Sequence, residues 1–235
     1  MPAEADMNSR LDRHAVIVLG GHPPNPAALT NLDPPFTVIC ADSGLDHALA
    51  LRLEPDVVIG DFDSVTAASL NRVRHEGVTV VPHPPDKDRT DAELAIHDAL
   101  DHGATRISVL WGGGDRIDHV LGVFAALAHP RLAQVNGLEV WMDRDHLHVL
   151  HPGVELSFDL PPSTLVSLIP LGSGDVRLTT NGLQWDLTDD VLHGHTARGV
   201  SNVVNQSPIR VRVDSGVLAI ITPDAVPAER ESGIG

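Results

Sequence analysis

Short β-branched runs alternate with Ala- and Leu-rich stretches through the first 142 residues, and this alternation limits the fold more than any other feature. Runs such as AVIVL at 15–19 and TVIC at 37–40 are long enough for buried strands but too short for helices. Strands that alternate with helices favour a mainly parallel sheet with helices on both faces. We predict strands at 15–19, 37–40, 57–59, 78–81, 106–110 and 138–142, and helices at 45–51, 67–75, 90–101 and 117–128.

The helical pattern stops after Leu147, where Gly, Pro and Asn pairs begin to separate short strand-like runs. Such spacing is typical of an antiparallel sandwich or barrel. We therefore predict an α/β protein with an N-terminal mainly parallel domain, residues 1–146, and a small C-terminal antiparallel β-sandwich or barrel domain, residues 147–235. The C-terminal strands are predicted at 154–158, 164–169, 175–179, 183–187, 201–204, 209–213 and 217–221.

Composition and charge exclude several classes of function. Acidic residues outnumber basic ones by 32 to 16, so the chain should repel nucleic-acid backbones while tolerating cations. A single cysteine, Cys40, excludes an internal disulfide framework. No apolar run approaches the length of a membrane span, and the first residues lack the apolar core of a signal peptide. We expect a cytoplasmic protein that binds neither nucleic acid nor membrane.

Aspartates follow four consecutive predicted strands, at the edge where open α/β sheets bind ligands. Asp61 and Asp63 lie in the segment GDFDS, where a tight turn at Gly60 would bring their carboxylates together. Mg²⁺ suits such paired oxygens, although an Asp-rich turn also caps helices without binding anything. The aspartates at these strand ends are Asp42, then Asp61 and Asp63, then Asp86, Asp88 and Asp91, then Asp115 and Asp118.

The segment DKDRTD, residues 86–91, ends at the start of a predicted helix. Thr90 followed by Glu93 has the spacing of a capping box, which favours a structural role. Lys87 and Arg89 beside a helix N-terminus also suit a phosphate, and Asp91 is a candidate to complete a metal site with the GDFDS carboxylates.

A third loop, GGGDRIDH at 112–119, combines flexible backbone with a strong anion ligand. Glycines let the backbone approach a ligand closely, and Arg116 is suited to bidentate phosphate binding. No Lys–Ser/Thr pair follows the glycines, so the loop is not a Walker A motif.

The β region offers weaker signals. Trp185 in NGLQW is one of three tryptophans, and physical arguments alone favour a core or interface anchor over a ligand contact. Ser201 and Asn202 in GVSN also suit ordinary turns. Two His-x-His pairs, 146/148 and 193/195, keep a zinc site open, although their spacing supplies no third ligand.

Taken together and in this order, the segments resemble the thiamine pyrophosphokinase family. The similarity extends from residue 41 to residue 202 and crosses both predicted domains. The resemblance implies transfer of a diphosphoryl group from ATP to thiamine with release of AMP. It also implies Mg²⁺ and a homodimer with substrate sites at the subunit interface. The matching segments are ADSG at 41–44, GDFDS at 60–64, DKDRTD at 86–91, GGGDRIDH at 112–119, NGLQW at 181–185 and GVSN at 199–202.

The resemblance also implies residue roles. The metal and the phosphates would contact Asp61, Asp63 and Asp91. The thiamine site would contain Trp185, Ser201 and Asn202. Asp42 or Asp118 would take the acceptor proton, a choice that the sequence leaves open. The further ATP-site candidates are Ser64, Lys87, Asp88, Thr90, Gly112, Gly113, Gly114 and Arg116.

Two rival functions remain at this level. One keeps the chemistry but changes the acceptor to a pterin alcohol, which would have little use for NGLQW and GVSN. The other is a nucleotide- or metal-binding module without catalysis.

Overall fold

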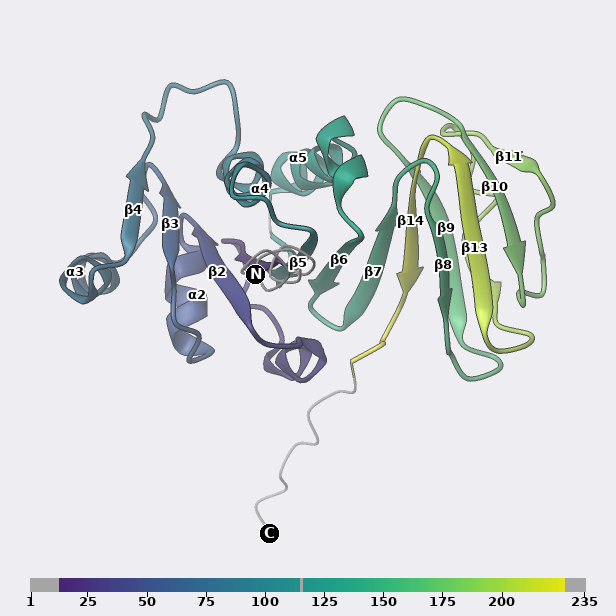
Figure 1. Cartoon of the computed structure of the whole chain (residues 1–235), viewed down its shortest axis with the longest axis horizontal. Helices are drawn as coiled ribbons and strands as arrows, with labels where there is room; N and C mark the ends of the chain where they lie inside the picture. Colours follow the sequence, from purple (N-terminus) through teal and green to yellow (C-terminus); the bar gives the residue numbers. More distant parts are fainter. Residues whose placement is uncertain (1–12, 115, 227–235) are drawn as a thin grey trace, which may run out of the picture.

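Two β-sheets form the core of the computed structural model, which describes residues 13–114 and 116–226 (Figure 1). One sheet has ten strands in the order β12-β9-β14-β7-β6-β5-β1-β2-β3-β4, and the other has four in the order β11-β10-β13-β8. No helix in these ranges is long and apolar enough to cross a lipid bilayer.

Six strands of the large sheet are parallel, as the alternating pattern predicts. Helices α2 and α3 cover one face, and α4 and α5 cover the other (Figure 1). The strands are β1 (His14–Val18), β2 (Phe36–Ala41), β3 (Val57–Gly60), β4 (Thr79–Pro82), β5 (Arg106–Trp111) and β6 (Gly137–Met142). The helices are α2 (Gly44–Ala50), α3 (Ala67–Glu76), α4 (Asp91–Asp101) and α5 (Ile117–Leu127), with short 3₁₀ helices η1 (Pro26–Asn31) and η2 (Pro130–Gln134).

Alternate residues of the central strands enter two separate hydrophobic cores. In β1, Ile17 packs toward α4 and α5, whereas Val16 and Val18 pack toward α2 and α3. All five residues of this strand are buried, and all except His14 are apolar, which explains the apolar run in the sequence.

The C-terminal strands form a sandwich in which the large sheet supplies one layer. β7 pairs antiparallel with both β6 and β14, so the large sheet continues across the predicted boundary at 146/147. A third core lies between the two layers. The large-sheet strands are β7 (Asp145–Leu150), β9 (Leu165–Leu171), β12 (Asn202–Val203) and β14 (Val217–Thr222); the small sheet contains β8 (Glu155–Phe158), β10 (Val176–Asn181), β11 (Asp190–Leu192) and β13 (Ile209–Ser215).

The α/β class with a C-terminal β region is thus confirmed, but two local predictions differ. The predicted strand at 183–187 is wrong, because the Asp186 carboxylate accepts hydrogen bonds from the backbone N–H groups of Gly182 and Leu183 and folds the segment into a turn. Strands β7 and β11 were not predicted.

The capping box at the start of α4 is confirmed. Glu93 N–H donates to the Thr90 hydroxyl at 3.2 Å, and Thr90 N–H donates to the Glu93 carboxylate at 3.0 Å. These bonds satisfy two donors that a helix start leaves unpaired.

We expect Thr90→Ala to lower the free energy of unfolding by about 1 kcal/mol, because it leaves the Glu93 N–H without its acceptor. Urea denaturation would measure the effect as a lower midpoint at unchanged slope. Thr90→Ser keeps the hydroxyl and should stay near the wild-type midpoint. Equal losses for both variants would show that the hydroxyl cap is not the cause.

Candidate active site

The carboxyl ends of β2 and β3 approach each other at Gly60, which has a φ of 151°. A side chain here would place its Cβ 3.2 Å from Oδ1 of Asp91 and 3.3 Å from Cα of Asp42. The Asp42 N–H donates to the Ile59 carbonyl at 2.8 Å, so a hydrogen bond joins the ends of β2 and β3. Glycine therefore lets acidic residues from three separate loops meet at one point.

Asp42, Asp61 and Asp63 bring one carboxylate oxygen each to within 4.8 Å of one another. We call these three residues the carboxylate cluster. Phe62 N–H donates to Asp42 Oδ1 at 3.1 Å, and the Ser64 hydroxyl donates to Asp42 Oδ2. These donors orient the carboxylates but leave their negative charges in place.

Lys87 supplies a positive charge beside the cluster. Its Nζ lies 3.3 Å from Asp61 Oδ2 and 3.1 Å from Asp91 Oδ1, and its side chain is only 13% exposed. Burial disfavours the ammonium, but the ion pairs with Asp91 and Asp61 outweigh it and raise the pKa of Lys87. Burial likewise opposes ionisation of Asp61, but the Asp63 N–H and Lys87 lower the pKa of its carboxyl.

Asp91 has an incompletely paired oxygen at this point. Its Oδ1 is buried, and within the described ranges it accepts no well-aligned hydrogen bond, although the Lys87 ammonium lies beside it. A buried carboxylate oxygen without a full set of donors is costly. Together with the carboxylate cluster, it fits the all-oxygen ligand preference of a hard divalent cation such as Mg²⁺.

The glycine-rich loop after β5 divides into a packed part and an open part. A Cβ on Gly112 would lie 2.3 Å from the Pro23 carbonyl oxygen, so this glycine is needed for packing. Gly113 and Gly114 have open space where a side chain would be, which leaves their backbone accessible. The structure therefore places two of the three predicted ATP-site glycines at an accessible surface.

Arg116 and Asp118 pair with each other at the exposed start of α5, with Nη2 of Arg116 2.5 Å from Oδ2 of Asp118. Arg116 is the main cause that lowers the pKa of the Asp118 carboxyl. Asp115 lies outside the described residues, and Asp88 is exposed in the loop before α4.

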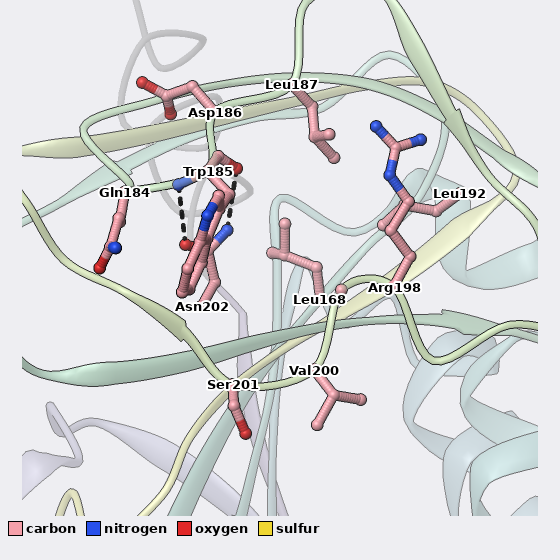
Figure 2. A pocket seen from close by; sticks show the side chains of 11 residues that line it. Leu168, Gln184, Trp185, Asp186, Leu187, Leu192, Arg198, Val200, Ser201 and Asn202 are labelled. Carbon is pink, nitrogen blue, oxygen red and sulfur yellow. Dashed lines mark hydrogen bonds between the residues drawn. The ribbon is translucent and has the colours of Figure 1, made fainter.

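A second candidate site is a cavity of about 670 Å³ in the β region (Figure 2). Trp185, Ser201 and Asn202 all line it, so the structure brings this predicted group together. Asn202 is buried and fixes the Trp185 backbone: its Oδ1 accepts from Trp185 N–H at 3.2 Å, and its Nδ2 donates to the Trp185 carbonyl at 2.9 Å. Trp185 is 57% exposed and lines the cavity.

Sequence reasoning missed two charged residues at this cavity. Asp186 accepts bonds from Thr180, Gly182 and Leu183 and holds the turn that carries Trp185. Arg198 lines the cavity and pairs with Asp190. Their positions directly after NGLQW and directly before GVSN were the available signals.

Family models match both halves of the chain. The thiamin pyrophosphokinase catalytic domain matches residues 33–141, and the thiamin pyrophosphokinase vitamin B1 binding domain matches residues 154–218. The two matches together cover well over half of the sequence and contain the carboxylate cluster and the Trp185 cavity, respectively. The chain belongs to the thiamin pyrophosphokinase family.

Individual relatives agree with this family. Thiamine pyrophosphokinase 1 of Arabidopsis thaliana is 29% identical, with 78% of this chain and 77% of the relative covered. The crystal structure of thiamin pyrophosphokinase from Geobacillus thermodenitrificans is 26% identical, with 89% and 97% covered and a TM-score of 0.68. That of the Bacillus subtilis thiamine pyrophosphokinase, at 24% identity, covers 91% and 100% with a TM-score of 0.76 and supports the shared fold. The ligand roles of the individual site residues stay predictions for this thiamin pyrophosphokinase family member.

We expect Lys87→Met to destabilise the metal-free protein by about 1–3 kcal/mol at pH 7, because Asp61 and Asp91 lose their cation. The lowered pKa of Asp61 contributes stability above the unfolded pKa of about 3.9, and this contribution is lost as pH falls through the folded value. The difference between wild type and variant should therefore shrink below about pH 4. Urea titrations between pH 3 and pH 8 would measure it.

The matched control is Arg72→Met, which breaks the exposed ion pair between Arg72 and Glu76. Exposed pairs contribute about 0–1 kcal/mol, so this variant should show little change. A Lys87→Met effect as small as the control, or one independent of pH, would contradict the electrostatic account.

Proposed function

We propose that this chain is a thiamine diphosphokinase, which transfers the diphosphoryl group of ATP to thiamine and yields thiamine diphosphate and AMP. The observation that carries the proposal is the presence, in one chain, of a carboxylate cluster paired with Lys87 and of a cavity lined by Trp185, each within its matching family segment.

Asp61, Asp63 and Asp91 would hold Mg²⁺, which would neutralise phosphate charge when bound. The residues of the chain would position the nucleotide: Lys87 offers a compact cation, and Gly113 and Gly114 offer accessible backbone. Phosphoryl transfer depends mainly on such positioning and charge neutralisation rather than on covalent catalysis.

In the transfer itself, the thiamine hydroxyl oxygen bonds to the β-phosphorus, and the bond from that phosphorus to the α–β bridging oxygen breaks to release AMP. The hydroxyl proton passes to a carboxylate. Asp42 is the better placed of the two candidates, because it lies in the carboxylate cluster, whereas Asp118 is paired with Arg116 on the exposed start of α5.

The Trp185 cavity suits a flat, cationic acceptor. An exposed indole stacks on aromatic rings and attracts positive charge through its π face, and thiamine carries a cationic thiazolium ring. Asn202 anchors the backbone of Trp185 at both its N–H and its carbonyl, so the ring is presented from a fixed turn.

The two half-sites of one chain are too far apart to act on one substrate pair. Between β3, beside the carboxylate cluster, and β9, beside the Trp185 cavity, the sheet order places seven strand spacings. At 4.7–4.9 Å per spacing this is roughly 34 Å of sheet. We therefore assign the chain a homodimeric state in which the carboxylate cluster of one subunit meets the Trp185 cavity of the other.

Exposed apolar side chains support this arrangement. Ile117 and Leu121 lie one turn apart on α5, next to the glycine-rich loop, and Leu165 and Val200 lie on or near the strands around the Trp185 cavity. Apolar surface beside both half-sites suits a subunit interface. The cytoplasm is the compartment that we propose, because a single buried cysteine and the use of ATP fit it.

The direct test incubates the protein with ATP, Mg²⁺ and thiamine and separates the products by chromatography. We expect AMP and thiamine diphosphate in equal amounts. Trp185→Ala should raise KM for thiamine about tenfold or more while leaving KM for ATP near wild type, because stacking on an aromatic ring is worth about 1–3 kcal/mol. A Trp185→Ala variant with unchanged thiamine kinetics would favour a different acceptor, such as a pterin alcohol.

ADP with thiamine monophosphate would contradict diphosphoryl transfer, and the absence of any thiamine-dependent product would favour a binding module. The double variant Asp61→Asn/Asp63→Asn serves as the catalytic control. It should lose turnover yet remain folded, because relief of carboxylate repulsion offsets the lost ion pair of Asp61, and Lys87 keeps its ion pair with Asp91.

A further inference from the structure

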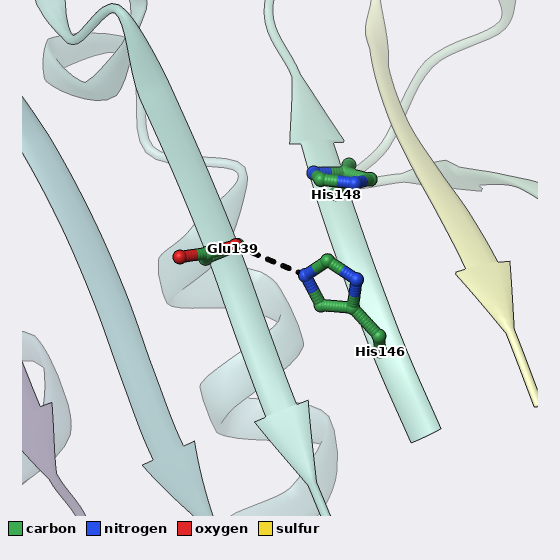
Figure 3. A group of neighbouring side chains, drawn as sticks. All are labelled: Glu139, His146 and His148. Carbon is green, nitrogen blue, oxygen red and sulfur yellow. Dashed lines mark hydrogen bonds and ion pairs between the residues drawn. The ribbon is translucent and has the colours of Figure 1, made fainter. Parts of the chain in front are cut away.

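A second group of potential metal ligands lies on one face of the large sheet, on the adjacent strands β6 and β7 (Figure 3). Glu139 of β6 is paired in register with His148 of β7, and His146, two residues before His148, lies on the same face of the sheet. One ligand atom from each of the three side chains lies within 4.8 Å of the others. In the described part of the chain, this group and the carboxylate cluster are the two that meet this condition.

The Glu139 carboxylate is buried and held in one orientation. Its Oε1 accepts from the Ser108 hydroxyl at 2.5 Å and from Nη2 of Arg106 at 3.3 Å. Its Oε2 faces Nε2 of His146 at 3.0 Å. The outer partners therefore occupy one oxygen and direct the other toward the two imidazoles, as the surroundings of metal-binding carboxylates commonly do.

His148 is the unpaired member of the group. Its ring packs against those of His146 and Phe158, with centroids 4.3 Å and 4.9 Å away. Across residues 13–114 and 116–226, no hydrogen bond reaches either of its ring nitrogens. Burial, followed by the neighbouring His146, lowers the pKa of His148 to about 4, so its ring is neutral near pH 7.

Glu139 carries the charge of the group. Burial opposes its ionisation, but hydrogen bonds from His146 and Ser108 outweigh burial and lower its pKa to about 2. An ionised carboxylate beside a neutral imidazole is the protonation state that a metal ion requires.

We propose that Glu139, His146 and His148 form a binding site for one zinc-class transition-metal ion. Two imidazole nitrogens and one carboxylate oxygen match the ligands that Zn²⁺ prefers, whereas Mg²⁺ prefers oxygen alone. The contact between His146 Nε2 and Glu139 Oε2 requires a proton in the metal-free protein, because a carboxylate only accepts hydrogen bonds. The metal takes the place of that proton, which moves to Nδ1, and water fills the fourth position.

The site is separate from the carboxylate cluster and its role is structural. Strands β5, β1 and β2 lie between β6 and β3, which amounts to roughly 19 Å of sheet. β6 and β7 are the pair at which the sheet changes from parallel to antiparallel, and Phe158 belongs to the opposing sheet. A bound ion links β6 to β7 and so stabilises this junction between the α/β region and the sandwich.

The test uses the full chain without a histidine tag, stripped of metal and titrated with Co²⁺ or Zn²⁺. We expect one equivalent of Co²⁺ to bind with the intense visible absorption of a tetrahedral site, and Zn²⁺ to displace it. Saturating Zn²⁺ should raise Tm by roughly 5–10 °C, because ligand binding to the folded state stabilises it. Mg²⁺ in excess should not displace Co²⁺.

His148→Phe removes a ligand but keeps an apolar ring beside Phe158, so the variant should fold, with a circular dichroism spectrum like that of wild type. We expect it to lose Co²⁺ affinity at least 100-fold and to lose the Tm shift. The matched control is His195→Gln, which alters the other His-x-His pair, at an exposed position, and should leave the spectrum unchanged.

Three results would overturn the proposal: no tetrahedral Co²⁺ spectrum in the wild-type protein, a spectrum that survives His148→Phe, or one that disappears in His195→Gln. Ser108→Ala gives a second check, because loss of the hydroxyl that orients Glu139 should weaken Zn²⁺ binding about 10–100-fold without removing a ligand. Unchanged Zn²⁺ affinity in this variant would count against a Glu139-centred site.

Discussion

Repulsion between carboxylates gathered at the carboxyl ends of β2 and β3 is the constraint on which the rest of the structure depends. Gly60 makes the gathering possible, because a Cβ there would crowd Asp42 and Asp91 at 3.2–3.3 Å and its φ of 151° disfavours other residues. Lys87 partly offsets the charge, and backbone N–H groups orient the oxygens. The carboxylates still outnumber the nearby cations. A divalent cation would offset this excess negative charge and could bind a triphosphate at the same time. The two helices on each face of the sheet provide the rigid support that holds these loops in place.

The continuous sheet fixes the distance between the two half-sites. Because β7 joins the parallel strands to the antiparallel ones, the Trp185 cavity cannot swing toward the carboxylate cluster of its own chain without breaking strand pairing. The proposed second subunit would supply the missing half-site without any deformation of the fold. The same junction carries buried Glu139 and the two half-buried histidines of β7, so the proposed metal would stiffen the region that sets the separation.

Much of the fold could be predicted from the sequence, because strands buried on both faces are continuous apolar runs and the start of α4 has a capping box. The meeting of Asp42, Asp61 and Asp63 followed from one rule, that parallel strands end at a common edge. Strand β7 was missed because its sequence, DHLHVL, places polar residues on a half-buried face. Glu139, the third member of the proposed metal site, could not be predicted from the sequence. It lies beside the two histidines because of the register between β6 and β7, which the spacing of residues along the chain does not encode.

The most direct test of the two-subunit site mixes two impaired variants, Asp61→Asn/Asp63→Asn and Trp185→Ala. The assay uses thiamine well below the KM of Trp185→Ala, where that variant retains about one tenth of wild-type activity or less. After subunit exchange at equal concentrations, half of the dimers are mixed. Each mixed dimer contains one intact site, which combines the carboxylates of the Trp185→Ala chain with the Trp185 cavity of the other chain. The mixture should then recover about one quarter of wild-type thiamine diphosphate formation. Mixed dimers that form, as shown by differently tagged subunits purifying together, but recover no activity would contradict the two-subunit site.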